Sequence, residues 1–207
     1  MAKILVTGGC GYIGSHTLVD LVENGYDVIS VDNNSRSNPR ILDGVEKIIG
    51  KKIKNYKVDL CNFDDLFAIF QANVDVIGII HFAAYKSVGE SVKDPLLYFE
   101  NNLTSLINLL KCVKEFETPY FVFSSSCTVY GNPDQVPVTE TTPPKPAESP
   151  YGYIKQMGEQ IVNEFAKSSG TQSILLRYFN PVGAHPSILI GEMPVGKPEN
   201  LVPVITQ

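Results

Sequence analysis

The segment TGGCGYIG at residues 7–14 decides the fold, because it joins a short apolar strand to an amphipathic helix. Gly8 permits a tight turn, Gly11 lets the backbone approach a pyrophosphate, and Gly14 allows close packing of the helix on a sheet. The first helical turn then presents free N–H groups and the positive end of the helix dipole to phosphates. The segment therefore predicts a dinucleotide-binding turn.

Outward from this turn, short apolar runs alternate with longer helical ones along the chain. The predicted strands are Lys3–Thr7, Asp27–Val31, Ile53–Val58, Val76–His81, Tyr120–Ser124 and Ser173–Arg177. The predicted helices are Tyr12–Asn24, Phe63–Gln71, Pro95–Glu117 and Pro150–Ser169. Such alternation indicates an α/β fold with a Rossmann-type, doubly wound parallel sheet. We expect residues 1–180 to form the dinucleotide-binding domain and residues 181–207 to begin a smaller substrate-binding lobe that is cut short.

Composition excludes several classes of protein. The net charge is −5 and no long basic stretch offsets it, which argues against nucleic acid and anionic membranes as partners. No apolar run approaches the ~18 residues of a membrane span, and no signal peptide is expected, so we expect a cytoplasmic protein. The four cysteines are scattered without metal-like spacing, and we expect reduced thiols and no metal site.

Asp32 ends the second predicted strand, 18 residues after Gly14. A carboxylate at this place accepts hydrogen bonds from the adenosine ribose and repels a 2′-phosphate, which favours NAD over NADP. Arg36 could serve such a phosphate, and a plain capping role for Asp32 stays open. Asp59, after the third strand, is expected near the adenine, although a turn aspartate fits the pattern as well.

Tyr151 and Lys155 open a predicted helix at a spacing that places both on one face. A free tyrosine has a pKa near ~10, and a nearby ammonium typically lowers it by ~1–3 units. With the charge of an oxidised nicotinamide added, Tyr151 is expected to act as a base. Ser126, among the hydroxyls that end the fifth strand, is expected to relay the proton. A surface Tyr–Lys pair and a local Ser/Thr turn are the plainer alternatives.

Six segments together resemble the extended short-chain dehydrogenase/reductases, and among these the NAD-dependent epimerase/dehydratase family. They are GGCGYIGSHT, Asp32-Asn33-Asn34, HFAAYKSVGES (His81–Ser91), SSSCTVYG, YGYIK and RYFNPVGAHPS (Arg177–Ser187). The resemblance covers essentially the whole chain, and the His81–Ser91 and Arg177–Ser187 segments are more specific than the glycine turn. Cys127 stands where alanine is commoner in the family.

The resemblance also implies a site, residue by residue. Catalysis would fall to Ser126, Tyr151 and Lys155. Cofactor contacts would come from Gly8, Gly11, Tyr12, Ile13, Gly14, Asp32, Asn33, Ser35, Asp59, Leu60, Phe82, Ala83, Ala84, Lys86, Asn101, Ser126, Tyr151, Lys155, Tyr178 and Phe179. Substrate contacts would come from Lys86, Ser126, Tyr151, Asn180, Asn200 and Leu201.

The implied activity is the interconversion of UDP-glucose and UDP-galactose through a 4-keto sugar, with NAD as the cofactor. A UDP-N-acetylhexosamine epimerase and a non-catalytic NAD-binding fragment remain as alternatives. Related 4,6-dehydratases carry an Asp-Glu pair where this chain has Cys127 and Thr128, so elimination would lack its proton donor. Decarboxylases with a glutamate near this position are disfavoured in the same way. The resemblance further implies a homodimer through the helices at Pro95–Glu117 and Pro150–Ser169, and low activity of these 207 residues alone.

Overall fold

A six-stranded parallel sheet organises the computed structural model, which describes residues 1–193 and 201–205. Its strands are β1 (Lys3–Thr7), β2 (Asp27–Val31), β3 (Lys54–Tyr56), β4 (Val76–His81), β5 (Tyr120–Ser126) and β6 (Gln172–Tyr178). They lie in the order β3-β2-β1-β4-β5-β6, with every neighbouring pair parallel. This is the strand order of a dinucleotide-binding Rossmann sheet, so the predicted fold class is confirmed.

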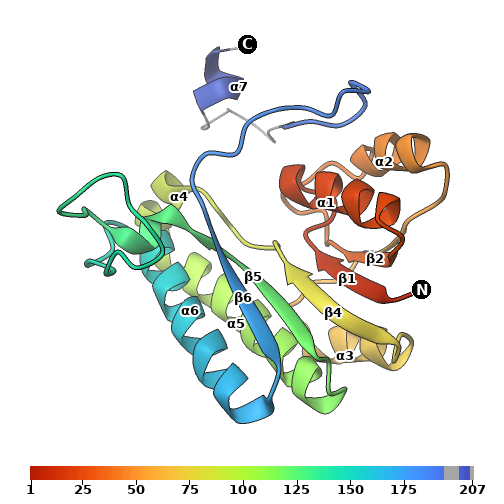
Figure 1. Cartoon of the computed structure of the whole chain (residues 1–207), viewed down its shortest axis with the longest axis horizontal. Coiled ribbons are helices and arrows are strands. Elements are labelled where there is room, and N and C mark those ends of the chain that lie inside the picture. Colours follow the sequence, from red (N-terminus) through yellow and green to blue (C-terminus); the bar gives the residue numbers. More distant parts are fainter. Residues whose placement is uncertain (194–200, 206–207) are drawn as a thin grey trace.

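Helices cover both faces of the sheet (Figure 1). They are α1 (Tyr12–Glu23), α2 (Ile41–Ile49), α3 (Phe63–Gln71), α4 (Val88–Lys93), α5 (Pro95–Glu115), α6 (Pro150–Ser169) and the short α7 (Leu201–Ile205), with a 3₁₀ turn at Cys127–Tyr130. One apolar cluster joins α1 and α2 to the sheet through Leu18 and Val45. A larger cluster joins α3, α5 and α6 to the opposite face through Leu66, Leu109 and Val162.

Local chemistry explains where the helices begin. The side chains of Asn62, Asp94 and Ser149 accept hydrogen bonds from the first turns of α3, α5 and α6. Gly170 follows α6 with a φ of 75°, the left-handed conformation that glycine adopts without strain. Asp94, Ser149 and Gly170 therefore mark helix ends by their own chemistry.

The direction in which the chain winds reverses at the neighbouring strands β1 and β4. From β1 it winds outward through β2 to β3, and it then returns to β4 on the other side of β1. Ligands of such sheets bind where the winding reverses, beyond the carboxyl ends of the strands. The fold therefore brings the ends of β1, β4 and β5 to one crevice.

Residues that follow β6 pass back over α1 and α2 (Figure 1). Ile190 is 4% exposed and packs in the cluster of α1 and α2, while the Leu189 carbonyl lies against Gly44. The described residues after 180 thus contact the dinucleotide half of the chain. The division into a domain at 1–180 and a lobe from 181 stays a prediction.

Candidate active site

The turn between β1 and α1 is as tight as its glycines predict. Gly8 has a φ of 70°, and a Cβ on Gly11 would lie 3.1 Å from the Gly8 carbonyl oxygen. A Cβ on Gly14 would overlap that same oxygen, so Gly14 is required by the turn itself and the expected helix–sheet reason is wrong. The residue that packs against the sheet is Gly9, where a Cβ would overlap the Ser30 hydroxyl of β2. Sequence reasoning gave Gly9 no role.

The N-terminus of α1 carries no side-chain cap and no acidic residue in its first turn. Like α2 and unlike α3, α5 and α6, α1 therefore leaves its first N–H groups to acceptors other than a capping side chain. Ile13 is half-buried in this turn, and the Tyr12 hydroxyl donates to the Gly183 carbonyl oxygen over 2.6 Å. The cradle of glycines and free N–H groups fits a pyrophosphate.

Asp32 lies at the end of β2 and ties two loops together. One carboxylate oxygen accepts from the backbone N–H of Cys10, and the other accepts from the Asn34 N–H and the Ser37 hydroxyl. The capping role that the sequence left open is therefore present. A carboxylate offers about four acceptor directions. One direction thus remains for an outside donor.

The other residues assigned to the adenosine end lie around Asp59. The Asn33 amide donates to its carboxylate over 3.4 Å, and the Ser35 N–H donates to the Asn33 side chain. Asp59 is exposed, as a nucleotide contact must be. Leu60 differs, because its side chain is 5% exposed and packs in the core cluster, leaving only its backbone near the surface.

The segment after β4 borders the glycine turn directly. The Ala83 N–H donates to the Thr7 hydroxyl, and a Cβ on Gly8 would lie 2.8 Å from the Ala83 nitrogen. Phe82, Ala83 and Ala84 are all half-buried there. Lys86 is exposed and its ammonium lies 3.6 Å from the Glu192 carboxylate, while Asn101 of α5 accepts at its carbonyl from the Cys61 thiol.

The predicted proton-transfer residues come together at the end of β5. The Ser126 hydroxyl lies near the Tyr151 phenol, and it accepts from the Thr128 N–H in a local turn. The Lys155 ammonium lies 5.6 Å from the centre of the Tyr151 ring. The expected closeness of Tyr151 to Lys155 and to Ser126 is present, and their roles in proton transfer stay predictions.

The expected lowering of the Tyr151 pKa is wrong for the protein by itself. Burial raises the pKa of Tyr151 to about 12, and the hydrogen bond from Ser126 offsets only part of this rise. Burial also lowers the pKa of Lys155 to about 8. The low-dielectric surroundings disfavour both charged forms, phenolate and ammonium.

The partners of the Lys155 ammonium are a backbone carbonyl and an aromatic ring rather than a carboxylate. Its ammonium donates to the Ser124 carbonyl oxygen over 2.6 Å and lies 5.0 Å from the centre of the Phe123 ring. His81 of β4 lies in the same layer, and burial followed by the charge of Lys155 lowers the pKa of His81 to about 3. Lys155 is therefore a buried ammonium among uncharged groups.

A buried ionic network that the sequence did not reveal fixes α6 on the sheet. Glu159 of α6 accepts two hydrogen bonds from the Arg177 guanidinium of β6, over 2.8 and 2.7 Å, and one from the Ser125 hydroxyl of β5. Arg177 also stacks on the Tyr130 ring, 4.8 Å from its centre. The network holds α6, with Tyr151 and Lys155, in register with β5.

A second link that the sequence did not reveal comes from α4. The buried Ser91 hydroxyl accepts from the backbone N–H of Tyr151 over 3.2 Å, and it donates to the Val88 carbonyl. The start of α6 is thus supported from two sides.

The residues after β6 line the outer part of the site. Tyr178 is half-buried, whereas Phe179 is 59% exposed and Asn180 is exposed. Phe179 and Cys127, the residue after Ser126, border an apolar cavity of about 330 Å³ that is also lined by Pro133 and Pro137 of the loop at residues 131–149. Asn200 lies outside the described residues, and Leu201 begins α7.

Two absences concern the described part of the chain alone. No helix in residues 1–193 and 201–205 is both long and apolar enough to cross a bilayer. Within the same ranges, no three His, Cys, Asp or Glu side chains gather as a metal site requires.

Comparison with known proteins gives consistent relatives. The sequence profile of the NAD dependent epimerase/dehydratase family matches residues 4–200. The chain is 47% identical to the UDP-glucose 4-epimerase of Schizosaccharomyces pombe and 46% identical to that of Bacillus subtilis, over 99% of its own length. It spans 58% and 60% of these two relatives.

A solved structure extends the likeness to the fold. The UDP-glucose 4-epimerase of Bifidobacterium longum, in complex with NAD⁺ and UDP, superposes with a TM-score of 0.95 at 46% identity. The alignment covers 98% of this chain and 61% of that one.

Proposed function

Because the chain belongs to the NAD dependent epimerase/dehydratase family, we propose that the complete protein interconverts UDP-glucose and UDP-galactose by reversible oxidation at sugar C4. The chain spans only about 60% of its relatives' length, so activity, substrates and partners are proposed rather than carried over. The observation that carries the proposal is the buried Lys155 ammonium 5.6 Å from the centre of the Tyr151 ring, with the Ser126 hydroxyl near the Tyr151 phenol.

NAD is the cofactor of this family, and the residues of the crevice fit it. Gly8, Gly11 and Gly14 allow a turn in which any Cβ would press on the backbone, and the start of α1, which has no side-chain cap, supplies donors for a pyrophosphate. We assign the adenosine ribose to the remaining acceptor direction of Asp32, with Asn33, Ser35 and Asp59 around it. Tyr178, Phe179 and Asn101 complete the proposed cofactor contacts.

Bound NAD supplies a reversible hydride acceptor beside the sugar. Tyr151 would take the proton of the 4-hydroxyl through Ser126 and return it after the 4-keto sugar has turned over. Its pKa of about 12 keeps Tyr151 protonated in the protein alone, so it would become a base only when further positive charge is near. The oxidised nicotinamide of bound NAD would bring that charge, and Lys155, 5.6 Å from the centre of the Tyr151 ring, would also hold the sugar of the nicotinamide nucleotide.

The surroundings of Ser126 favour epimerisation over elimination. The next two residues are Cys127 and Thr128, which open the 3₁₀ turn. Neither carries a carboxyl group, the general acid that related 4,6-dehydratases place there to protonate the departing hydroxyl. A 4,6-dehydratase reaction would lack its proton donor there.

We test the proposed base with Tyr151→Phe in a complete protein, and Tyr120→Phe serves as the control because Tyr120 is exposed at the start of β5, at the other end of the strand from Ser126. Turnover should fall by about 10²–10⁴-fold in Tyr151→Phe alone, since a positioned acid–base group contributes about this much. NAD content, measured after protein denaturation, should stay unchanged. Near-normal turnover in Tyr151→Phe would exclude Tyr151 as the base.

The substrate is tested by incubating the complete protein with UDP-galactose and UDP-N-acetylgalactosamine, without added NAD. Turnover of the first supports this proposal, and turnover of the second alone favours the N-acetylhexosamine alternative. We place Lys86, Asn180, Asn200 and Leu201 at the substrate. The 207-residue chain should show little turnover, and a rate near that of a complete relative would contradict this.

We further propose a cytoplasmic homodimer that associates through α5 and α6, with the chain divided near residue 180. Leu96, Ile107 and Tyr153 are exposed on these helices and would be covered by a partner. Sedimentation that finds only monomers at high concentration would contradict the dimer. Fractionation that finds the protein outside the cytoplasm would contradict the location.

A further inference from the structure

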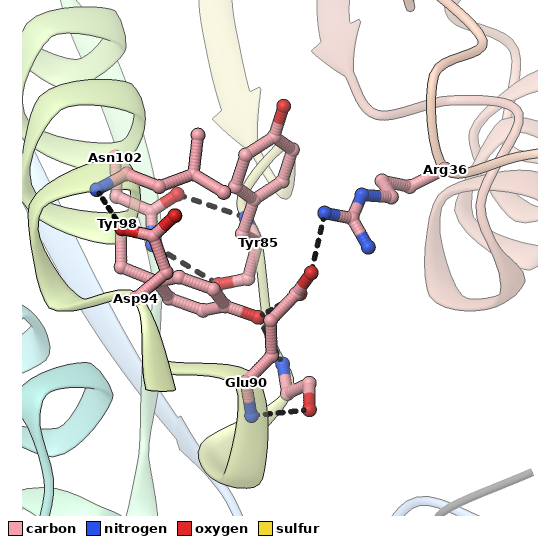
Figure 2. A network of polar contacts seen from close by, with 8 residues as sticks. Arg36, Tyr85, Glu90, Asp94, Tyr98 and Asn102 are labelled. Carbon is pink, nitrogen blue, oxygen red and sulfur yellow. Dashed lines mark hydrogen bonds and ion pairs between the residues drawn. The ribbon is translucent and has the colours of Figure 1, made fainter. Parts of the chain in front are cut away.

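Arg36 bridges the loop after β2 to helix α4 (Figure 2). Its guanidinium donates to the Glu90 carboxylate over 2.8 Å and lies 4.6 Å from the centre of the Tyr85 ring. The residues joined are 54 positions apart in the sequence. Arg36 therefore has both an ionic and an aromatic partner on the α4 side of the crevice.

Glu90 is itself held firmly in this orientation. The Tyr98 hydroxyl donates to its second carboxylate oxygen over 2.7 Å and accepts from the Ser87 N–H over 3.1 Å. Tyr98 is completely buried, and the Ser87 hydroxyl accepts from the Glu90 N–H. The position of the Glu90 carboxylate is thus fixed by its own side of the crevice, and Arg36 binds it there.

Tyr85, which forms the floor under Arg36, is equally fixed. Its backbone N–H donates to the Asn102 side chain over 2.8 Å, and its carbonyl accepts from the same amide over 3.0 Å (Figure 2). Its ring meets the Tyr98 ring edge to face. The aromatic face and the carboxylate form one rigid acceptor for a guanidinium.

An arginine shortly after the ribose carboxylate is the group with which Rossmann enzymes accommodate the 2′-phosphate of NADP. Arg36 follows Asp32 by four residues, in the loop whose Asn34 and Ser37 bind the Asp32 carboxylate. Left free, its guanidinium would attract the phosphate that Asp32 repels. In this chain Glu90 and Tyr85 already occupy it.

We propose that Glu90 is a specificity-determining residue of the dinucleotide site, which excludes NADP by holding Arg36 away from the adenosine ribose. The inference rests on the proposed dinucleotide site and adds a second barrier to that of Asp32. It also gives a role to Arg36, whose side chain contacts Glu90 and Tyr85.

The test compares binding of NAD and NADP, which differ only in the 2′-phosphate, to the 207-residue chain freed of nucleotide. Isothermal titration calorimetry on wild type, Glu90→Gln and Glu90→Gln/Arg36→Met gives the two dissociation constants for each protein. Glu23→Gln is the control, because it removes one carboxylate of the same kind at the far end of α1. Thermal unfolding checks that each variant is folded.

In Glu90→Gln, the affinity for NADP relative to NAD should rise by up to about fivefold, since the substitution removes an exposed ion pair and leaves the contact of Arg36 with the Tyr85 ring in place. The rise should vanish in the double variant and be absent in Glu23→Gln. An unchanged ratio in Glu90→Gln overturns the inference, as does a rise that persists without Arg36. An equal loss of affinity for NAD and NADP in Glu90→Gln would mean that Glu90 supports the dinucleotide site without discriminating between the two. That result also overturns the inference.

The failure of this inference is distinguishable from failure of the proposed function. Wild-type chain that binds neither dinucleotide contradicts the cofactor site itself. Wild-type chain that binds NAD, with variants that leave the ratio unchanged, contradicts the role of Glu90 alone.

Discussion

Replacing Lys155 with methionine should make the protein more stable while removing its function. Lys155 is 4% exposed, and burial lowers its pKa from 10.5 to about 8. A change of this size corresponds to about 3 kcal/mol by which folding disfavours the ammonium over the neutral amine. Its contact with the Ser124 carbonyl does not cancel that cost.

The net gain is smaller than the cost of the buried charge. Methionine fills a similar volume without a charge, but it leaves the Ser124 carbonyl without the lysine donor, at a cost of about 1 kcal/mol. We therefore expect the free energy of unfolding at pH 7 to rise by about 2 kcal/mol. Affinity for NAD should fall, because the proposed contact to the nicotinamide ribose is lost.

The gain should depend on pH in one direction. Below pH 8 the ammonium is charged in the folded and the unfolded chain, so the full penalty is present. Between pH 8 and 10.5 the unfolded chain keeps a proton that the folded chain has released, and the wild type becomes more stable relative to the variant. The difference between the two proteins should shrink over this range.

Urea denaturation at pH 7 and pH 9.5, followed by circular dichroism, measures both effects. Lys167→Met is the control, since Lys167 is exposed on the same helix, and it should change stability by less than about 0.5 kcal/mol. A destabilised Lys155→Met, or a gain that is equal at both pH values, would refute this account of the buried ammonium.

Two further substitutions test the scaffold of the site. Glu159→Gln should lower the free energy of unfolding by about 3 kcal/mol, because Arg177 and Ser125 lose a buried carboxylate; a change under about 1 kcal/mol in urea denaturation would mean that the network is not coupled to folding. Gly14→Ala should reduce NAD affinity more than tenfold in calorimetry, as its Cβ would displace the Gly8 carbonyl that shapes the pyrophosphate cradle. Gly89→Ala is its control, because nothing lies near a Cβ there, and equal affinities of the two variants would argue against the cradle.

Periodicity and turn chemistry predicted most of the sheet. β1, β2 and β4 have the predicted bounds, whereas β3 is only Lys54–Tyr56 instead of Ile53–Val58. β3 is an edge strand that pairs with β2 alone, and the Ile53 N–H donates to the Glu46 carboxylate instead. β5 extends to Ser126, because it pairs with β6 as far as Tyr178. Ladder partners decide such ends, and they are not visible in one sequence.

The helices that were missed had recognisable signals. α2 has apolar residues at Ile41, Val45 and Ile48 with Gly50 behind them, a helical period followed by a left-handed stop. α4 follows Ser87 with Glu90 three residues later, the pattern of a capping box. In the structure the Glu90 carboxylate binds Arg36 and Tyr98 instead of the backbone N–H of Ser87, so tertiary contacts override the capping box.

The sequence predicted which of these side chains lie together better than it predicted their pKa values. Spacing alone placed Tyr151 and Lys155 on one helical face, and position at a strand end placed Ser126 beside them. The direction of the Tyr151 pKa was missed, because it depends on how deeply the phenol is buried. The ionic network around Glu159 was missed because its three members come from three different elements.

The short helix α4 has a consequence for recombining this fold with that of its relatives. One of its residues, Glu90, binds the loop beyond β2, and the next, Ser91, supports the backbone of Tyr151. The two halves of the sheet are therefore not interchangeable modules. In a chimera that takes its first three strands from another family member, Glu90 would face a loop that did not evolve with it. Further substitutions at this contact would be needed before the hybrid site could work.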